Sequence, residues 1–148
     1  MYRNYLKRLF DIVSSCAVLI FASPVLLFLA LLIRIRLGAP VIFSQVRPGK
    51  NGKLFRLYKF RSMTDARDAD GKLLPDAERM TDFGRKLRAT SLDELPELIN
   101  ILKGDMSVVG PRPQLVRDMV FFTPEEMERQ SVLPGLTGLA QINGRNNI

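Results

Sequence analysis

The sequence predicts an α+β protein that is mainly helical, with an N-terminal re-entrant membrane helix, a small β-hairpin and a cytosolic helical domain. Residues 12–33 form an uncharged apolar run that contains Pro24. Residues 41–60 hold two strand-like runs around a turn. In the rest of the chain, apolar residues recur at helical spacing between glycine and proline stops. We therefore assign residues 1–36 to the membrane element and residues 37–148 to the cytosolic domain.

The apolar run is long enough to reach across a bilayer. Its 22 residues carry no charge, and as a straight helix they would cover roughly 33 Å. Pro24 lacks an amide hydrogen, and its ring clashes with the carbonyl group of Ile20. The sequence therefore predicts a break at Ser23 and Pro24, where the Ser23 hydroxyl can bond to the carbonyl oxygen that is freed.

Basic residues flank the apolar run on both sides. Arg3, Lys7 and Arg8 precede it, and Arg34 and Arg36 follow it. Because cytoplasmic flanks are rich in lysine and arginine, we expect both ends to stay on the cytoplasmic side, with the helix turning at its break. A straight span is the main alternative, since membrane helices tolerate proline. A signal peptide is not favoured, because no small-residue cleavage site follows the run. A buried core helix is rarely so long.

Charge is unevenly distributed along the chain. The net charge is +7, and residues 1–63 hold 11 of the 22 basic residues but only one of the 15 acidic ones, Asp11. This basic half suits an anionic membrane surface. We expect no nucleic-acid partner, because arginine-rich helices, zinc-ligand spacings and aromatic RNA-binding motifs are absent. Cys16 is the only cysteine and histidine is absent, so acid–base and metal chemistry must come from carboxylates, lysines or tyrosines.

Two strand-like runs, residues 41–46 and 54–60, flank a turn with an Asn-Gly pair at residues 51–52. That pair is typical of a β-hairpin. Strand alternation places Lys59 and Arg61 on one face where the second run ends. These cations indicate either an anion site or a solvated strand end.

Helix signals follow the hairpin. After a polar loop over residues 64–79, Thr81 is the predicted cap of a helix that continues through Arg88. Thr123 and Pro124 mark another helix start, since proline suits the first helical position.

A further apolar stripe predicts a helix that ends at Gly104. Its start is open, because Ser91 and Glu94 fit a capping box whereas Pro96 fits the first helical position. Either start places Asp93 and Glu94 at the N-terminus of a helix. In one interpretation, the two carboxylates only cap the helix and offset its dipole. In the other, the positive helix end keeps Asp93 ionised, which a metal ligand or a nucleophile requires.

Two later segments indicate ligand contacts. Pro111 and Pro113 fix the backbone around Arg112, which either binds phosphate oxygens in a bidentate manner or belongs to an ordinary turn. Residues 134–145 are punctuated by glycine and end on Arg145, which is typical of a loop whose backbone approaches a ligand.

Taken together, these features resemble the bacterial monotopic phosphoglycosyl transferases of the small kind, within the bacterial sugar transferases. The resemblance is carried by six ordered motifs, KRLFD at 7–11, YKFRSM at 58–63, LDELP at 92–96, GDMS at 104–107, GPRP at 110–113 and GLTGLAQ at 135–141. The motifs extend over essentially the whole chain. The resemblance implies a re-entrant membrane helix followed by a catalytic domain.

The resemblance also implies a reaction at the cytoplasmic face of the bacterial inner membrane. A sugar-1-phosphate passes from a UDP-sugar to a polyprenyl (undecaprenyl) phosphate with release of UMP, the first membrane step of glycoconjugate assembly. Asp93 is implied as the covalent nucleophile and the ligand of Mg²⁺, with Glu94 as its acid–base partner. The implied substrate contacts are Lys59, Arg61, Arg112, Pro113, Gln141 and Arg145. The sugar, the glycan pathway and the oligomeric state are not implied.

Two other functions are compatible with these features, and the sequence differs from the family at its C-terminal end. A membrane-docked adaptor would bind anionic lipid through the basic half of the chain. A metal-dependent hydrolase would cleave the UDP-sugar with water and release the sugar phosphate into solution.

Family members continue for several tens of residues past the position of Arg145, with amphipathic helices and a tryptophan. This sequence ends at Ile148 without tryptophan, so we expect it to be C-terminally truncated.

Overall fold

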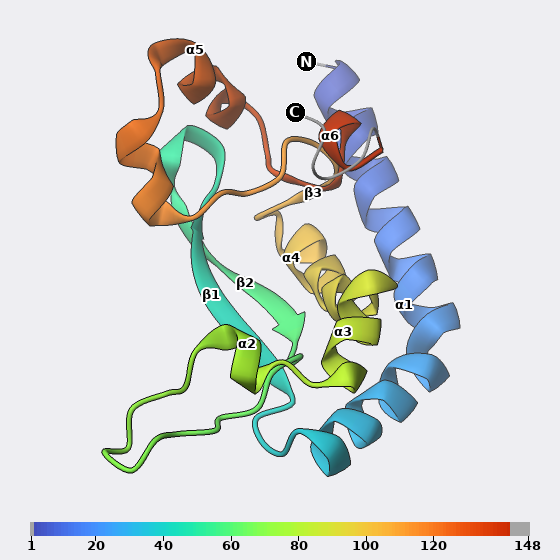
Figure 1. Cartoon of the computed structure of the whole chain (residues 1–148). Coiled ribbons are helices and arrows are strands. Elements are labelled where there is room, and N and C mark those ends of the chain that lie inside the picture. Colours follow the sequence, from blue (N-terminus) through green and yellow to red (C-terminus); the bar gives the residue numbers. More distant parts are fainter. Residues whose placement is uncertain (1, 143–148) are drawn as a thin grey trace. The chain divides into compact units, whose positions relative to one another are not determined.

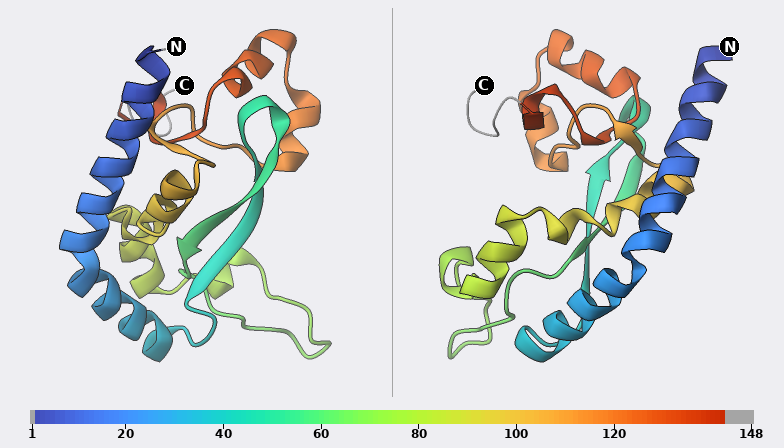
Figure 2. Two further views of the ribbon diagram at one scale, coloured as in Figure 1. Left: turned by 180° about the vertical axis from the view of Figure 1, so that it is seen from behind. Right: turned by 90° about the vertical axis from the view of Figure 1, so that its right-hand side faces the viewer.

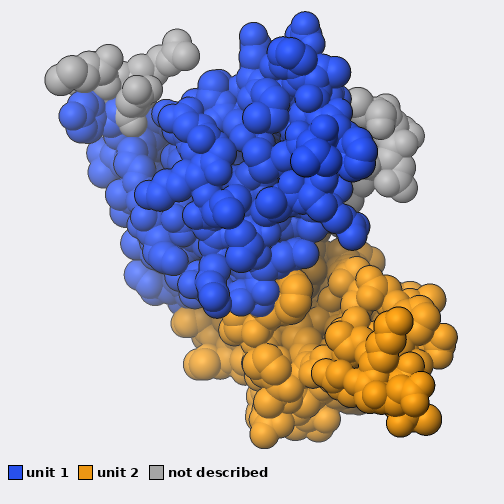
Figure 3. Space-filling model, turned by 90° about the vertical axis from the view of Figure 1, so that its left-hand side faces the viewer, with its two compact units in different colours: residues 1–21, 44–58, 97–148 blue, residues 22–43, 59–96 orange. Residues whose placement is uncertain are grey.

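The computed structural model describes residues 2–142, and the chain divides into two compact units (Figure 3). Unit 1 consists of Met1–Phe21, Ser44–Tyr58 and Glu97–Ile148. Unit 2 consists of Ala22–Phe43 and Lys59–Pro96. The chain passes between the units within its longest helix and within both strands of the hairpin.

Helix α1 (Tyr2–Arg36) contains the whole apolar run (Figure 1). Within the described residues it is the one helix that is long and apolar enough to cross a membrane. Helical conformation continues through Pro24. A proline inside a helix removes one hydrogen bond and either kinks or breaks the helix. Because α1 continues past Pro24, a turn at this position would be a kink within α1. Many large apolar side chains of α1 are exposed, including Phe21 and Leu27.

The predicted hairpin is present as a two-stranded sheet of β1 (Ile42–Pro48) and β2 (Leu54–Phe60) (Figures 1 and 2). A short 3₁₀ turn, η1 (Lys50–Gly52), joins the strands. Asn51 and Gly52 have φ values of 55° and 74°. Asparagine and glycine tolerate positive φ better than other residues, so the Asn-Gly pair allows the chain to reverse here.

Two short helices follow the polar loop that begins after β2. Helix α2 (Asp76–Arg79) lies at the end of the loop, and α3 (Asp82–Ala89) follows it. The predicted cap of α3 is confirmed, because the Thr81 hydroxyl accepts a hydrogen bond from the Gly84 amide over 3.1 Å. Leu87 of α3 is buried, as the helical spacing predicts.

The predicted helix before Gly104 begins later than a capping box would place it. A 3₁₀ turn, η2 (Leu92–Glu94), precedes α4 (Glu97–Lys103). Ser91 has a left-handed conformation with φ 56° and makes no capping hydrogen bond, so the predicted capping box is wrong. The alternative start at Pro96 is close to the observed one. Gly104 ends the helix as predicted, and its amide donates to the carbonyl oxygen of Ile101.

The core of unit 2 includes the second half of α1. Ile33 and Leu37 pack with Phe60 of β2 and Leu87 of α3, and Ile33 is fully buried. The core is completed by Leu29 and by partly buried neighbours, namely Leu26, Ala30, Val41, Phe83, Leu92 and Leu95. Burial of each large apolar side chain contributes about 1.5–3 kcal/mol. The end of α1 is therefore part of the folded core of unit 2.

In unit 1, polar side chains dock the first half of α1. The guanidinium of Arg8 donates to the carbonyl oxygens of Ile101 and Leu102 over 2.5 and 2.8 Å. A cation suits these carbonyl groups at the C-terminal end of α4. Asp11 is buried and accepts a hydrogen bond from the amide of Val108 over 3.1 Å. The motif at residues 7–11 thus holds α1 against α4 and the strand that follows it.

The remainder of unit 1 contains a small parallel sheet that the sequence did not predict. Strand β3 (Ser107–Val109) pairs with β4 (Gly135–Thr137), with Ser107 opposite Gly135. The chain between them forms η3 (Val116–Phe121), α5 (Pro124–Met127) and η4 (Glu128–Ser131), and α6 (Leu139–Ile142) follows β4. The predicted start of α5 is confirmed by a complete capping box at Thr123. A Cβ atom on Gly135 would lie 2.1 Å from the amide nitrogen of Gly110, so glycine is required for this close approach.

Candidate functional site

Unit 2 brings Lys59 and Glu94 together from the end of β2 and from η2. The Nζ atom of Lys59 lies 2.9 Å from Oε1 of Glu94, and the side chains are 18% and 9% exposed. Of the two interpretations that the sequence allowed, a solvated strand end is therefore excluded for Lys59. The attraction between the charges must offset the free energy of removing both groups from water.

Asp93 is buried next to this ion pair, with 6% of its surface exposed. Burial raises the pKa of its carboxyl group above the usual 3.8. The charge of Lys59 opposes this shift, the charge of Glu94 adds to it, and the charge of Arg88 opposes it. Asp93 lies in a three-residue 3₁₀ turn ahead of α4. The charges of Lys59 and Arg88 favour its ionised form, while the predicted effect of the helix N-terminus stays a prediction.

Arg88 is a member of this cluster that the sequence did not single out. It extends from the last turn of α3, and its Nε atom donates to the hydroxyl oxygen of Ser62 over 2.8 Å. Ser62 is buried at the end of the YKFRSM motif. A basic residue in the last turn of a helix is common for dipole reasons alone, so only the packing of α3 reveals that Arg88 lies near Asp93.

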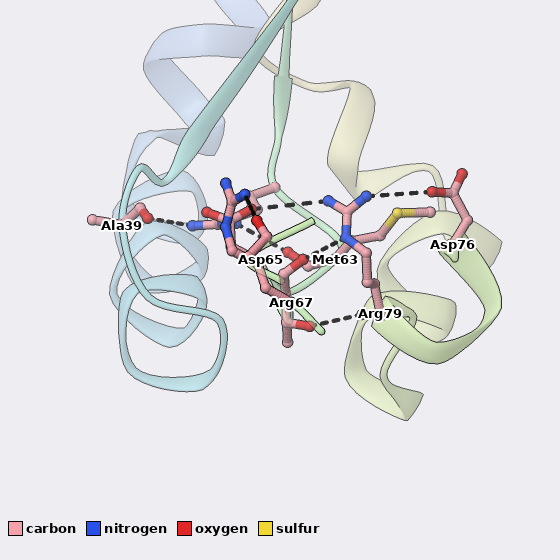
Figure 4. A network of polar contacts seen from close by, with 9 residues as sticks. Ala39, Met63, Asp65, Arg67, Asp76 and Arg79 are labelled. Atoms are coloured by element: carbon pink, nitrogen blue, oxygen red, sulfur yellow. Dashed lines mark hydrogen bonds and ion pairs between the residues drawn. The ribbon is translucent and has the colours of Figure 1, made fainter. Parts of the chain in front are cut away.

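Arg61 has a structural role in unit 2. Its Nε atom donates to the carbonyl oxygen of Met63 over 3.0 Å, and Nη1 donates to that of Ala39. Its remaining nitrogen forms an ion pair with Asp65 (Figure 4). All three guanidinium nitrogens thus have protein partners, while the substrate contact implied by the resemblance stays a prediction.

Arg79 closes the base of the polar loop beside Asp65 (Figure 4). Its Nε atom donates to the carbonyl oxygen of Thr64 over 2.9 Å, and an Nη atom lies 3.4 Å from the carboxylate of Asp76. Arg61 beside Asp65 lowers the pKa of that carboxyl group below its usual value. Arg79 therefore holds the two ends of the loop together through its contacts with Thr64, Asp65 and Asp76.

Unit 1 contains the other predicted site residues that the structure describes. Arg112 and Pro113 are half-buried between β3 and η3. They line a shallow surface hollow together with Phe122 and Arg129. Gln141 belongs to α6, and Arg145 lies outside the described residues.

Known proteins resemble this chain along nearly its whole length. A family model described as bacterial sugar transferase matches residues 2–148. The chain is 53% identical over 143 residues to the uncharacterized sugar transferase EpsL of Bacillus subtilis (strain 168), which covers 97% of this chain and 71% of that protein. It is 47% identical over 148 residues to the exopolysaccharide production protein PSS of Rhizobium leguminosarum bv. phaseoli, which covers 94% and 74%.

Longer relatives contain a similar segment. The UDP-glucose:undecaprenyl-phosphate glucose-1-phosphate transferase of Klebsiella pneumoniae is 47% identical over 144 residues, which is 93% of this chain and 31% of that protein. The undecaprenyl-phosphate galactose phosphotransferase of Salmonella typhimurium (strain LT2) is 43% identical over 163 residues, which is 98% of this chain and 34% of that protein. The chain thus spans most of the shorter relatives and about a third of the longer ones.

Proposed function

Since the chain belongs to the bacterial sugar transferase family and is therefore a transferase, we propose that it moves a sugar-1-phosphate from a UDP-sugar to undecaprenyl phosphate and releases UMP. The names of relatives that act on undecaprenyl phosphate support this reaction. The observation that carries the proposal is the cluster in unit 2, where the buried carboxyl groups of Asp93 and Glu94 lie beside the cation of Lys59.

Asp93 is the proposed nucleophile of the first half-reaction. A carboxylate oxygen of Asp93 attacks the β-phosphorus of the UDP-sugar, and the bond from that phosphorus to the bridging oxygen breaks. UMP leaves with the bridging oxygen, and the sugar phosphate remains on Asp93 as an acyl phosphate. The raised pKa of Asp93 supports this role, because burial makes its carboxylate less stabilised and more basic than one in water.

The second half-reaction regenerates Asp93. An oxygen of undecaprenyl phosphate attacks the same phosphorus, and the bond to Asp93 breaks. Glu94 takes the proton of the attacking phosphate, and the Lys59 ammonium 2.9 Å away stabilises the charges involved. The products are an undecaprenyl diphosphate sugar and a free Asp93 carboxylate.

Both substrates and Asp93 are anionic, so their mutual repulsion has to be offset. Lys59 supplies a cation next to the carboxylates. Arg112 and Arg145 are proposed to bind the phosphates of the donor, together with Pro113, which follows Arg112, and Gln141, which lies in the same glycine-punctuated segment as Arg145. Arginine suits this role because its planar group binds two phosphate oxygens at once.

Mg²⁺ is the proposed cofactor. Within residues 2–142, no group of three or more His, Cys, Asp or Glu side chains could hold a metal ion. Mg²⁺ usually needs only one or two protein carboxylates, because it shares substrate phosphates and water. Asp93 fits as that ligand, since burial disfavours its charge and a cation would offset this cost. When bound, Mg²⁺ neutralises part of the charge of the diphosphate.

The contacts of α1 support a re-entrant arrangement with both ends on one side of the membrane. Near its start, Arg8 binds the carbonyl groups at the end of α4. Near its end, Ile33 packs with Phe60 and Leu87. A straight span would place Arg8 and Ile33 near opposite faces of the bilayer.

The chain that joins these contact partners makes a straight span unfavourable. Residues 60–101 run from Phe60 to Ile101 and would have to cross the bilayer as well. Within the described residues, α1 is the one helix that could do so by length and composition. We therefore propose that α1 enters and leaves by the cytoplasmic leaflet, with a kink at Ser23 and Pro24 that lets the domain remain cytosolic.

The proposed reaction is tested by UMP release. The chain in detergent or nanodiscs is given Mg²⁺ and a panel of UDP-sugars, with or without undecaprenyl phosphate. We expect catalytic UMP release with at least one UDP-sugar, only when undecaprenyl phosphate is present, and a lipid-linked sugar product. Turnover without the lipid, with free sugar phosphate, would indicate a hydrolase. Lipid binding without UMP release from any donor would indicate an adaptor.

A further inference from the structure

The backbone on either side of Arg112 is held by three different elements of unit 1. The carbonyl oxygens of residues 111–113 each accept a hydrogen bond from a separate donor. The Gly135 amide in β4 donates to the first over 2.9 Å. Nη2 of Arg129 in η4 donates to the second over 3.3 Å, and Nη1 of Arg47 in β1 donates to the third over 3.4 Å.

The backbone around Arg112 depends on hydrogen bonds from other elements, because its two prolines cannot donate hydrogen bonds within the segment. Pro111 and Pro113 have no amide hydrogen, so they cannot donate to a local turn. The rings fix φ at these two positions but leave the peptide planes free to rotate about ψ. The direction in which the Arg112 side chain leaves the backbone therefore depends on what binds the carbonyl groups.

The two guanidinium donors come from distant parts of the chain, and Arg47 tolerates a local electrostatic cost. Burial lowers the pKa of Arg47, and the nearby charge of Arg112 lowers it further. The charges of Glu97 and Asp118 act in the opposite direction. Arg47 and Arg112 are thus kept close together although their charges repel. Such an arrangement suits a place where an anion binds.

We propose that Arg129 and Arg47 are positioning residues that orient Arg112 toward the phosphates of the nucleotide donor. They act through the carbonyl groups of residues 112 and 113, and their own side chains need not touch the substrate. This inference rests on the proposed function, in which Arg112 is a phosphate contact. It adds that the affinity of this contact is set by donors in η4 and β1.

UDP binding tests the inference, because UDP carries the diphosphate without requiring turnover. Equilibrium dissociation constants for UDP are measured at fixed Mg²⁺ with the whole chain in detergent. Loss of one hydrogen bond predicts that Arg129→Ala weakens UDP binding by about two- to tenfold. Arg129→Lys should weaken it less, because an ammonium group can still donate to the carbonyl oxygen. The thermal midpoint of each variant shows whether it folds.

A double-mutant cycle separates positioning from general stability. Arg112→Ala alone should weaken UDP binding on the order of tenfold or more. In that background, Arg129→Ala should change the dissociation constant by less than about twofold, since the side chain it orients is gone. The matched control is Arg85→Ala in α3, because the Arg85 side chain is 60% exposed and pairs with Asp82 of the same helix. It should bind UDP like the wild type.

The outcomes distinguish this inference from the proposed function. If Arg129→Ala costs as much affinity in the Arg112→Ala background as in the wild type, Arg129 does not act through Arg112 and the positioning role is wrong. If Arg112→Ala itself leaves UDP affinity unchanged, the phosphate contact assumed in the proposed function is wrong. Rescue by Arg129→Lys together with a non-additive cycle would support the positioning role.

Discussion

Lys59 and Glu94 form an ion pair 2.9 Å long, although 35 positions separate them in the sequence. The pair joins the end of β2 to η2 and lies beside the buried carboxyl group of Asp93. A buried charge that loses its partner is costly. Removing one partner would therefore destabilise unit 2, and the intact pair holds the proposed acid–base residue next to the proposed nucleophile.

Replacing Lys59 by Met should separate the effect of this pair on folding stability from its effect on catalysis. Lys59→Met removes a cation from a buried carboxylate, so the free energy of unfolding should fall by about 3 kcal/mol. The double variant Lys59→Met, Glu94→Gln should recover much of that loss, because the Glu94 carboxylate is no longer left buried without its partner. Neither variant should release UMP at more than about a hundredth of the wild-type rate. Wild-type turnover in Lys59→Met would show that this cation is dispensable.

Asp93→Asn should stabilise the fold while it abolishes transfer. Because burial raises the pKa of Asp93, the folded state binds its proton more tightly than the unfolded chain does. The ionised form is thus destabilising at neutral pH, and stability is recovered as the pH falls through the raised pKa. The thermal midpoint of Asp93→Asn should exceed that of the wild type at pH 7. The difference should vanish below the usual pKa of 3.8.

The control for this comparison is Asp70→Asn, at an exposed position in the polar loop. Its thermal midpoint should equal the wild-type value at pH 7. An Asp93→Asn variant that melts below the wild type at pH 7 would mean that the ionised carboxylate is favoured by its surroundings.

Arg112→Lys should lower transfer although it keeps the positive charge. A lysine offers one ammonium group where arginine offers a planar pair of donors for two phosphate oxygens. We expect the KM for the UDP-sugar to rise on the order of tenfold. Steady-state UMP release over a range of donor concentrations provides the measurement. An unchanged KM and kcat would make Arg112 an ordinary turn residue.

Local patterns in the sequence predicted the elements that are determined locally. The Asn-Gly pair at residues 51–52, the caps Thr81 and Thr123, and the stop at Gly104 are each found at or near the expected place. Each depends on the conformational preferences of a few adjacent residues. The general reaction was also predicted, because the ordered motifs resemble those of a known family.

Long-range contacts could not be read from such patterns. The strands β3 and β4 are three residues long, which is too short to show an alternation. The bond from Arg88 to Ser62 depends on how α3 packs. Ser91 adopts a positive φ, so the capping box that its sequence favours does not form. The pairing of β3 with β4 and the bond from Arg88 to Ser62 join residues distant in sequence, so local propensity cannot predict them.

Labelling of single cysteines should report the same side of the membrane for both flanks of α1. Tyr2→Cys and Ser44→Cys are each made in a Cys16→Ser background and treated in intact cells with a reagent that cannot cross the inner membrane. Because both flanks are basic and each end of α1 has contacts, Arg8 within unit 1 and Ile33 within unit 2, neither cysteine should react until the membrane is opened. Reaction of only one of them in intact cells would indicate a straight span.

The covalent intermediate on Asp93 is tested most directly by the mass of the intact protein. The chain is incubated with Mg²⁺ and a UDP-sugar that supports turnover, without undecaprenyl phosphate. We predict one equivalent of UMP and a protein heavier by one sugar phosphate, with no adduct on Asp93→Asn and with loss of the adduct when undecaprenyl phosphate is added. Glu94→Gln should form the adduct and discharge it slowly. An active enzyme that shows no added mass, and releases UMP only when both substrates are bound, would contradict the covalent route.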